Sequence, residues 1–353
     1  MDSDILIIGA GVIGLGSALE LLQRGAGVTV LERGIAGSES SWAGGGILSP
    51  LCPWDYSDDV TRLTSRGAAL FPAWAQALHE ATGIDPEYEA NGMLVLPPFD
   101  AQAARQWCAA HEVRRQLLED GTLLLPDVAQ VRNPRLMQAL RSRVEMLGGR
   151  IMEQCEVRGI MAEEGRVRAL ATSSGEFGAD NFIVTAGAWS RQVLGQYALQ
   201  MDIKPMRGQM LLFKFDAPPL QHIVLQGDLY LIPRRDGHLL VGSTLEDVGF
   251  DKGTTQAAHD SLRQRAETIL PQLRSMPLVQ HWAGLRPASP HNIPTIARHP
   301  QLENLYLNSG HFRYGVTMAV ASAEILLNEM TNAPQPFDVT PYQAGWRNDL
   351  LQS

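Results

Sequence analysis

The sequence predicts a mixed α/β chain, α+β overall, with a doubly wound, Rossmann-like dinucleotide-binding domain and a second domain built on an antiparallel sheet. An apolar strand at residues 4–8 leads through a glycine-rich turn into a helix expected at residues 12–24, and a second strand follows at residues 28–32. Such a strand–helix–strand unit builds a parallel sheet. Past residue 203 the pattern changes to short strands joined by tight turns, which is typical of antiparallel pairing.

The elements between the first unit and residue 203 are predicted from periodicity and from the residues that end them. Helical spacing of apolar residues marks three segments, and short apolar runs mark three strands. Pro72 interrupts the first helix, and Gly148 with Gly149 ends the third. The expected helices are 61–82, 101–118 and 134–147, and the expected strands are 93–96, 150–157 and 182–185.

The second half supplies the antiparallel part. Strands are expected at residues 210–215, 229–233 and 238–243, with residues 234–237 as a connecting turn, and a helix at 254–270 is stopped by Pro271. Glycine and small residues return at 282–287 and 309–321. We therefore expect a discontinuous layout. Residues 1–84, 131–202 and 278–353 would form the dinucleotide-binding domain, and residues 85–130 and 203–277 the substrate-binding domain.

Composition excludes several classes of protein. The chain has 353 residues and a formal net charge of −9, and it has no run of basic residues, so a nucleic-acid partner is not expected. Its three cysteines are unpatterned, which predicts neither a disulfide framework nor a metal site. The first residues carry acidic rather than basic side chains, and no long apolar run follows, so neither a secretory signal nor a membrane segment is expected. These features predict a cytoplasmic protein.

The glycine-rich turn carries a dinucleotide-binding fingerprint. Gly9, Gly11 and Gly14 follow the first strand and open a helix, and Glu32 ends the second strand. The first glycine permits the tight turn, the second lets the backbone approach a pyrophosphate, and the third lets helix and strand pack closely. Glu32 can accept hydrogen bonds from ribose hydroxyls. A glycine-rich turn alone is weak evidence for dinucleotide binding, but the strand, the helix and the acidic residue together favour it.

Two features favour FAD over NAD. The chain begins with the fingerprint, and the hydroxyl- and glycine-rich stretch 40–47 follows at a distance suited to the rest of a long dinucleotide. A flexible surface loop is the alternative interpretation of that stretch. There is no second fingerprint for a nicotinamide cofactor, so electrons are expected to come directly from the substrate. An NAD-dependent dehydrogenase stays open as a competitor, and visible flavin absorbance decides between the two.

Further motifs spread over nearly the whole chain. They are Ile-Gly-Ala-Gly-Val-Ile-Gly at 8–14, Leu-Glu-Arg at 31–33, Asn-Gly-Met at 91–93, Thr-Ala-Gly-Ala-Trp-Ser at 185–190, Lys-Pro-Met-Arg-Gly-Gln at 204–209, Tyr-Leu-Ile-Pro-Arg at 230–234, Val-Gly-Ser-Thr at 241–244, Trp-Ala-Gly-Leu-Arg-Pro at 282–287 and Gly-His-Phe-Arg-Tyr-Gly at 310–315. With these motifs the chain resembles the D-amino-acid oxidase-type flavoproteins, and among them the glycine oxidases linked to thiazole formation in thiamine synthesis.

The resemblance implies a bound FAD and a set of site residues. The FAD is expected to be non-covalent, because no cysteine occurs in either flavin-side segment. Arg286 would hold the substrate carboxylate with help from the Tyr230 hydroxyl, and Arg313 would line the same pocket. The residues implied at the cofactor are Gly9, Gly11, Val12, Ile13, Gly14, Glu32, Arg33, Ser40, Ser41, Gly45, Gly46, Ile47, Val157, His311, Phe312, Arg313, Tyr314, Gly315, Val316 and Thr317.

Physical chemistry gives these side chains plausible tasks, each with an alternative. Guanidinium groups capture carboxylates in a bidentate manner, but Arg286 could instead form an interdomain salt bridge and Arg313 could pair with a local acid. Tyr230 on a strand is as often a packing residue. A helix starting near Gly315 would direct amides at charge developing on the reduced flavin. His311 is interpreted as a flavin-loop residue that acts mainly through its backbone.

The predicted activity is oxidative deamination of glycine and other small amino acids such as sarcosine and small D-amino acids. Hydride transfer to flavin would give an imine, then glyoxylate and ammonia, and dioxygen would give hydrogen peroxide. The imine is expected to feed thiazole synthesis, and the family pattern implies a homo-oligomer, with a tetramer suspected. A dehydrogenase that passes electrons to a quinone or partner protein, and a non-catalytic flavin-binding protein, stay open. Leu245, Asp228 and the stretch 47–54 depart from the relatives and leave the preferred amine undetermined.

Overall fold

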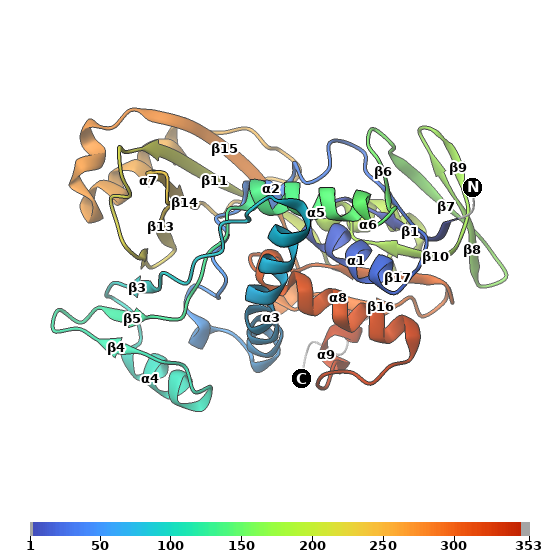
Figure 1. The fold of residues 1–353 in the computed structure, drawn as a ribbon, viewed down its shortest axis with the longest axis horizontal. Coiled ribbons are helices and arrows are strands. Elements are labelled where there is room, and N and C mark those ends of the chain that lie inside the picture. The colour runs from blue at the N-terminus through green and yellow to red at the C-terminus, as the bar shows by residue number, and fades with distance from the viewer. Residues whose placement is uncertain (1–2, 347–353) are drawn as a thin grey trace.

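The computed structural model describes residues 3–346, and its two large sheets lie in separate parts of the molecule (Figure 1). Residues 1–2 and 347–353, at the ends of the expected dinucleotide-binding domain, lie outside the described residues. One sheet has six strands in the order β16-β17-β10-β1-β2-β6. Its strands are β1 (Ser3–Ile8), β2 (Val28–Leu31), β6 (Arg150–Met152), β10 (Ala179–Val184), β16 (Thr295–Arg298) and β17 (Leu305–Ser309).

The pairing in this sheet is that of a doubly wound fold. β1 pairs in parallel with β2 and β10, and β10 pairs in parallel with β17, while only the edge strand β16 is antiparallel. Helices on one face bury its apolar side chains around Ile5, Ile7 and Val30. They are α1 (Val12–Gln23), α3 (Asp58–Thr82), α5 (Asn133–Met146) and α8 (Gly315–Thr331). The mixed α/β class with parallel and antiparallel sheets is therefore confirmed.

The opposite face of the six-stranded sheet is covered by a small antiparallel sheet. It consists of β7 (Val157–Glu163), β8 (Arg166–Thr172) and β9 (Gly175–Phe177). Val167 and Leu170 from β8 pack against Leu6 and Phe182 of the large sheet. The short helices α6 (Ser190–Leu194) and α9 (Thr340–Gln343) complete this domain, and α9 packs against β16.

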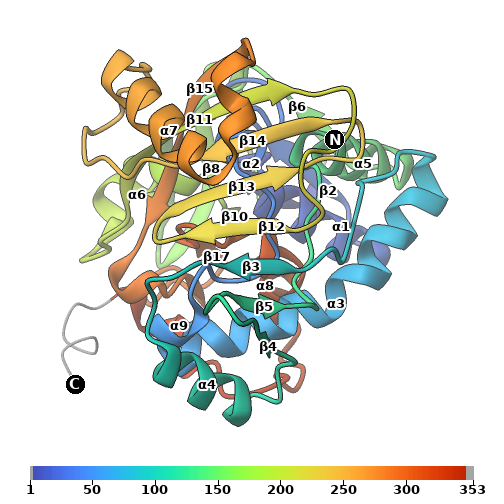
Figure 2. The same cartoon turned by 90° about the vertical axis from the view of Figure 1, so that its left-hand side faces the viewer.

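The second large sheet has eight strands in the order β15-β11-β14-β13-β12-β3-β5-β4 (Figure 2). Its strands are β3 (Met93–Val95), β4 (Gln116–Leu117), β5 (Leu123–Leu125), β11 (Lys204–Lys214), β12 (Ile223–Gln226), β13 (Leu229–Pro233), β14 (His238–Gly242) and β15 (Leu278–Ala288). α7 (Gln256–Ile269) packs on one face through Leu262 and Ala266. α4 (Ala101–Ala110) contributes Ala104 and Cys108 to the core on the other.

Two expected elements are shorter than the sequence pattern indicated. The helix expected at 101–118 ends at Ala110, because Glu112 adopts a left-handed backbone (φ 55°) and β4 then pairs with β5. The strand expected at 150–157 splits into β6 and β7. Gln154 turns the chain with φ 56°, and Cys155 N–H donates to the Glu32 carbonyl at 2.8 Å. Each half then joins a different sheet.

The expected boundary at residue 278 meets a strand of the other sheet. β15 pairs with β11 along its length, with Gly208 opposite Gly284 and Met206 opposite Arg286. We therefore propose to place this boundary after Ala288. Within residues 3–346, no helix is both long and apolar enough to cross a membrane.

Candidate active site

A deep cavity opens where the carboxyl ends of the parallel strands face the eight-stranded sheet. Its empty volume is about 1720 Å³, part of it open to solvent. The wall includes the residues that directly follow β1, β2 and β10, namely Gly9, Glu32 and Thr185. Tyr230, Ser243 and Arg286 come from the other sheet. Ligands of open α/β sheets bind at such strand ends.

The glycine turn is shaped as the fingerprint predicts. Gly9 has φ 106°, and a Cβ there would lie 2.8 Å from the Thr185 carbonyl oxygen. A Cβ on Gly14 would lie 1.9 Å from the Gly9 oxygen, so this glycine permits the close packing of helix on strand and lies off the cavity wall. Gly11, Val12 and Ile13 line the cavity at the start of α1, which has no capping side chain on its N-cap residue. The turn thus presents backbone close to the cavity.

Glu32 organises the turn from the next strand end. Its two carboxylate oxygens accept from the Ala10 and Gly34 amides, each at 2.9 Å, and its side chain still lines the cavity. The Arg33 guanidinium lies 3.7 Å from the Trp189 ring centroid and donates to Glu39 at 3.1 Å. With Val157 these side chains line one end of the wall. That end carries the aromatic, charged and ribose-accepting groups expected around an adenosine.

The stretch 40–47 lies along the middle of the cavity and is not an isolated surface loop. It begins with the short helix α2 (Ser40–Ala43), and Ser41 Oγ accepts from the Val12 amide at 2.9 Å. Gly46 has φ 76°, and a Cβ there would lie 2.1 Å from the Val131 oxygen. Ser40, Ser41, Gly45, Gly46 and Ile47 all line the wall.

The segment 310–317 forms another side of the cavity. Gly310 and Phe312 have φ of 89° and 48°, and this tight turn delivers the chain into α8 at Gly315. The first turn of α8 has no acidic residue and its N-cap has no capping side chain, so its amide end faces the cavity at Gly315 and Val316. Thr317 is fully buried and donates to the Ile47 carbonyl at 3.2 Å, off the wall.

His311 lines the cavity yet is buried, and its Nε2 lies 2.9 Å from Ser322 Oγ. Burial lowers the pKa of His311 to about 3. The ring is therefore neutral at working pH, and its Nε2 is engaged by Ser322. Tyr314, also on the wall, donates to the Tyr56 hydroxyl, and burial raises the pKa of Tyr314 well above its usual value. Neither side chain is set up to exchange protons with a substrate near neutral pH.

Arg286 reaches the cavity from β15. Its Nη2 donates to Ser243 Oγ at 2.6 Å and its Nη1 to the Thr244 carbonyl at 3.2 Å. Gly208 makes room for the guanidinium, since a Cβ there would lie 2.0 Å from Arg286 Nη1. Within residues 3–346 neither Arg286 nor Arg313 has a carboxylate partner. Burial, with the nearby Arg313 charge, lowers the pKa of Arg286.

Two guanidinium groups without a protein counterion thus face one cavity, which favours an anionic ligand. The Tyr230 hydroxyl donates to Met210 Sδ at 3.3 Å, a weak acceptor that a carboxylate oxygen can replace. The Arg313 guanidinium also lies 5.7 Å from the Phe312 ring centroid. The alternatives of an interdomain salt bridge for Arg286 and a local acid for Arg313 find no partner among the described residues.

Sequence reasoning left several wall residues without a task. Thr185, Trp189 and Ser243 lie inside motifs that the sequence analysis singled out, but no sequence pattern shows that these side chains face the cavity. Leu245 and Asp228 do not line the wall, and Asp228 pairs with Arg265 instead. In the described part of the chain, no group of three or more metal-ligating side chains is present.

The wall fits an extended dinucleotide. It combines close-approach glycines, an acid at one end and two helix N-termini that attract anionic groups. The buried Asn308 Oδ1, on a wall residue, has no hydrogen-bond partner in the described structure. The fold and the site together define an α/β protein that binds an extended dinucleotide at the ends of its parallel strands.

Comparison with known proteins agrees with this class. The family model described as FAD dependent oxidoreductase matches residues 4–328, so the chain belongs to this family and FAD is its cofactor. The resemblance to D-amino-acid oxidase-type flavoproteins is thereby confirmed. The glycine oxidase of Pseudomonas aeruginosa is 42% identical, over 98% of this chain and 100% of that protein. The glycine oxidase of Pseudomonas putida is 40% identical, over 97% and 98%.

Two further similarities extend the comparison. The "Bifunctional protein ThiO/ThiG" of Trichormus variabilis is 31% identical over 92% of this chain, which spans 52% of that protein. The crystal structure of glycine oxidase from Geobacillus kaustophilus superposes with a TM-score of 0.91 at 26% identity, over 97% of this chain and 98% of that one.

Proposed function

We propose that the chain is an FAD-dependent oxidase that deaminates glycine and other small amino acids. The observation that carries the proposal is the pair Arg286 and Arg313, two guanidinium groups that share the cofactor cavity without a protein counterion. The relatives at 42% and 40% identity, named glycine oxidase, support the same substrate class. Sarcosine and small D-amino acids belong to that class as well.

The cofactor would be held by residues already placed on the wall. The turn at Gly9 and Gly11 would approach the pyrophosphate, Glu32 would accept from the ribose, and the amide end of α8 at Gly315 would stabilise negative charge on the ring system. FAD supplies a two-electron hydride acceptor whose electrons pass on to dioxygen. No covalent attachment is proposed, and the cofactor is held by these contacts alone.

The protein's own task is to bind and orient the amino acid. Arg286 holds the carboxylate, the Tyr230 hydroxyl donates to one of its oxygens, and Arg313 adds positive charge to the same pocket. This clamp fixes the direction of the α-C–H bond, and alignment at near-attack distance supplies much of the rate. His311 is neutral and bonded to Ser322, so no base is assigned to it. The amine therefore reacts in its neutral form.

The overall reaction balances without a further reactant. Glycine loses a hydride from carbon and a proton from nitrogen and becomes an imine, which water hydrolyses to glyoxylate and ammonia. Dioxygen takes up the two electrons and two protons as hydrogen peroxide. We further propose that the imine supplies thiazole formation in thiamine synthesis, as the family resemblance implies; the similarity to the "Bifunctional protein ThiO/ThiG" supports this proposal.

The test is anaerobic mixing of the purified yellow protein with glycine, sarcosine, both alanine enantiomers and both proline enantiomers. The flavin absorbance should bleach with at least one of these amines, and bleaching with none would refute the proposal. Peroxide formed in air, measured against amine consumed, separates an oxidase from a dehydrogenase that uses a quinone or partner protein. An Arg286→Met variant that still binds flavin but whose flavin no longer bleaches at low glycine concentration would support the role of Arg286 in holding the substrate carboxylate.

The assembly and the compartment are separate proposals. We propose a homo-oligomer, a tetramer in the first instance, as the family resemblance implies, and a location in the cytoplasm. Light scattering of the purified flavoprotein measures its mass against the 38.6 kDa of one chain. Fractionation of cells that express the chain tests the compartment.

A further inference from the structure

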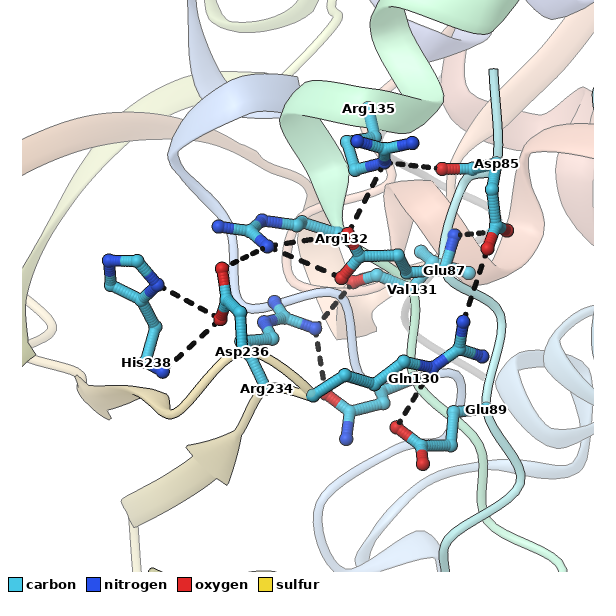
Figure 3. Close-up of polar contacts among 11 residues, drawn as sticks. Asp85, Glu87, Glu89, Gln130, Val131, Arg132, Arg135, Arg234, Asp236 and His238 are labelled. Carbon is cyan, nitrogen blue, oxygen red and sulfur yellow. Dashed lines mark hydrogen bonds and ion pairs between the residues drawn. The ribbon is translucent and has the colours of Figure 1, made fainter. Parts of the chain in front are cut away.

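Arg234 is a fully enclosed cation that joins the two domains beside the cavity. It follows β13 at the turn into β14 and is 4% exposed. Its Nη2 donates to the Gly45 carbonyl at 2.7 Å, and its Nη1 donates to Gln130 Oε1 at 2.7 Å and to the Val131 carbonyl at 2.8 Å. Three chain segments that are far apart in sequence therefore meet at one guanidinium, and Figure 3 shows its contacts with Gln130 and Val131.

Arg234 stays charged at neutral pH although its surroundings lower its pKa. Burial, and next the neighbouring Arg132, lower its pKa to about 10, which leaves the guanidinium protonated at neutral pH. Around it lie Arg132 and Arg135 and the carboxylates Asp85, Glu87, Glu89 and Asp236 (Figure 3). Arg235 pairs with Asp85 and Glu89 of this group. Ion pairs within this group are partly exposed, whereas Arg234 itself touches only neutral acceptors. A buried cation is costly unless it is hydrogen-bonded, and in Arg234 both terminal nitrogens are bonded while the buried Nε has no partner among the described residues.

The Gly45 carbonyl matters because of the peptide to which it belongs. In a planar trans peptide the N–H points opposite to the C=O. With the Gly45 carbonyl directed at Arg234, the Gly46 N–H points to the opposite side, and both glycines line the cavity. The Gly46 carbonyl is bonded to the Val131 amide at 2.9 Å. No acceptor for the Gly46 N–H is found within residues 3–346.

We propose that Arg234 is a positioning residue for the flavin: it holds the Gly45–Gly46 peptide so that the Gly46 N–H donates to the cofactor. An arginine suits this task because its planar fork reaches acceptors through both terminal nitrogens, whereas a lysine ammonium is a single point. Since β13 also carries Tyr230, near its start, the same strand supports the cofactor loop at one end and one wall of the substrate pocket at the other. The inference rests on the flavin site and not on which amine is oxidised.

The experiment compares Arg234→Lys and Gln130→Met with wild type. Arg234→Lys keeps the charge but cannot meet all acceptors, and Gln130→Met removes one group that holds the guanidinium in place. Each apoprotein is first checked for folding by circular dichroism. FAD dissociation constants are then measured by flavin fluorescence without substrate, together with the visible spectrum and the flavin reduction potential. Arg235→Gln is the matched control, because Arg235 ties the same turn to Asp85 and Tyr88 without touching residues 44–47.

The expected result is graded. FAD should bind at least tenfold more weakly to Arg234→Lys and about threefold more weakly to Gln130→Met, with a changed visible band and a more negative potential, while Arg235→Gln stays within twofold of wild type. A folded Arg234→Lys or Gln130→Met protein with the wild-type constant, spectrum and potential overturns the proposal. Equal effects from Arg235→Gln overturn it too, since they would reflect the domain junction alone. If Arg234→Lys does not fold, the Gln130→Met result decides.

Discussion

Gly208→Ala should displace the Arg286 guanidinium without disturbing the fold. The new Cβ would lie 2.0 Å from Nη1, 2.3 Å from Nη2 and 2.4 Å from Cζ of Arg286. An ordinary contact begins at 3.4 Å, so the guanidinium must move by more than 1 Å. The clashing atoms are the far end of a flexible side chain, so the strand pairing of β11 with β15 survives. The contacts of Arg286 with Ser243 and Thr244 do not.

Misplacing a binding group by about 1 Å costs on the order of a hundredfold in rate, or about 2.7 kcal/mol of transition-state stabilisation. We therefore expect kcat/KM for glycine to fall about a hundredfold, while FAD affinity and the melting temperature change little. Anaerobic stopped-flow reduction of the flavin over a glycine series measures the loss directly.

Gly159→Ala is the matched control for this substitution. Gly159 lies on β7 and does not line the cavity wall, and a Cβ there would meet nothing within 4 Å. Wild-type flavin reduction by Gly208→Ala would show that the position of Arg286 does not matter. A loss of FAD with the substrate effect would show that the glycine serves the fold instead.

Three further outcomes are expected. The unfolded chain takes up a proton at His311 below pH about 6.5, whereas the folded protein does so only near pH 3, so the free energy of unfolding falls as pH drops. Between pH 7.5 and 5 the wild-type protein should lose about 2 kcal/mol more stability than His311→Gln, as measured by urea denaturation. Equal losses would contradict the assignment. Tyr230→Phe should raise KM for glycine about tenfold or more through the lost hydrogen bond to a charged group, with unchanged FAD binding; an unchanged KM would make Tyr230 a packing residue. Burial raises the pKa of Cys52 to about 11, so iodoacetamide at pH 8 should modify this thiol about a hundredfold more slowly than an unperturbed thiol. Mass spectrometry follows the modification, and a normal rate would mean that Cys52 is open to solvent.

The parts of the fold that could be predicted from sequence are those encoded locally. The first unit has an apolar strand, a glycine turn, a helix and Glu32 within about thirty residues, and each piece agrees with the others. The segment 278–288 was expected to belong to the dinucleotide-binding domain, as a glycine-rich segment where the chain re-enters that domain. They form β15, because their partner β11 lies some seventy residues earlier and supplies the hydrogen bonds.

The site was predictable by residue type, but not in its supporting contacts. Guanidinium groups and a tyrosine next to glycine-rich segments indicate an anion pocket, and the family pattern points to the same side chains. The partners of Arg286, Ser243 and the Thr244 carbonyl, lie about forty residues away. The bond from Arg234 to the Gly45 carbonyl spans 189 residues. No local pattern encodes such a contact, because it depends on how two sheets meet.

The internal bonds of Glu32 bear on how the holoenzyme is assembled. Because its carboxylate already ties Ala10 to Gly34, and Ser41 already holds the Val12 amide, the nucleotide end keeps its shape before any flavin arrives. These bonds join protein groups to one another, so the shape of the nucleotide end is set by the chain's own contacts as well as by those with a ligand.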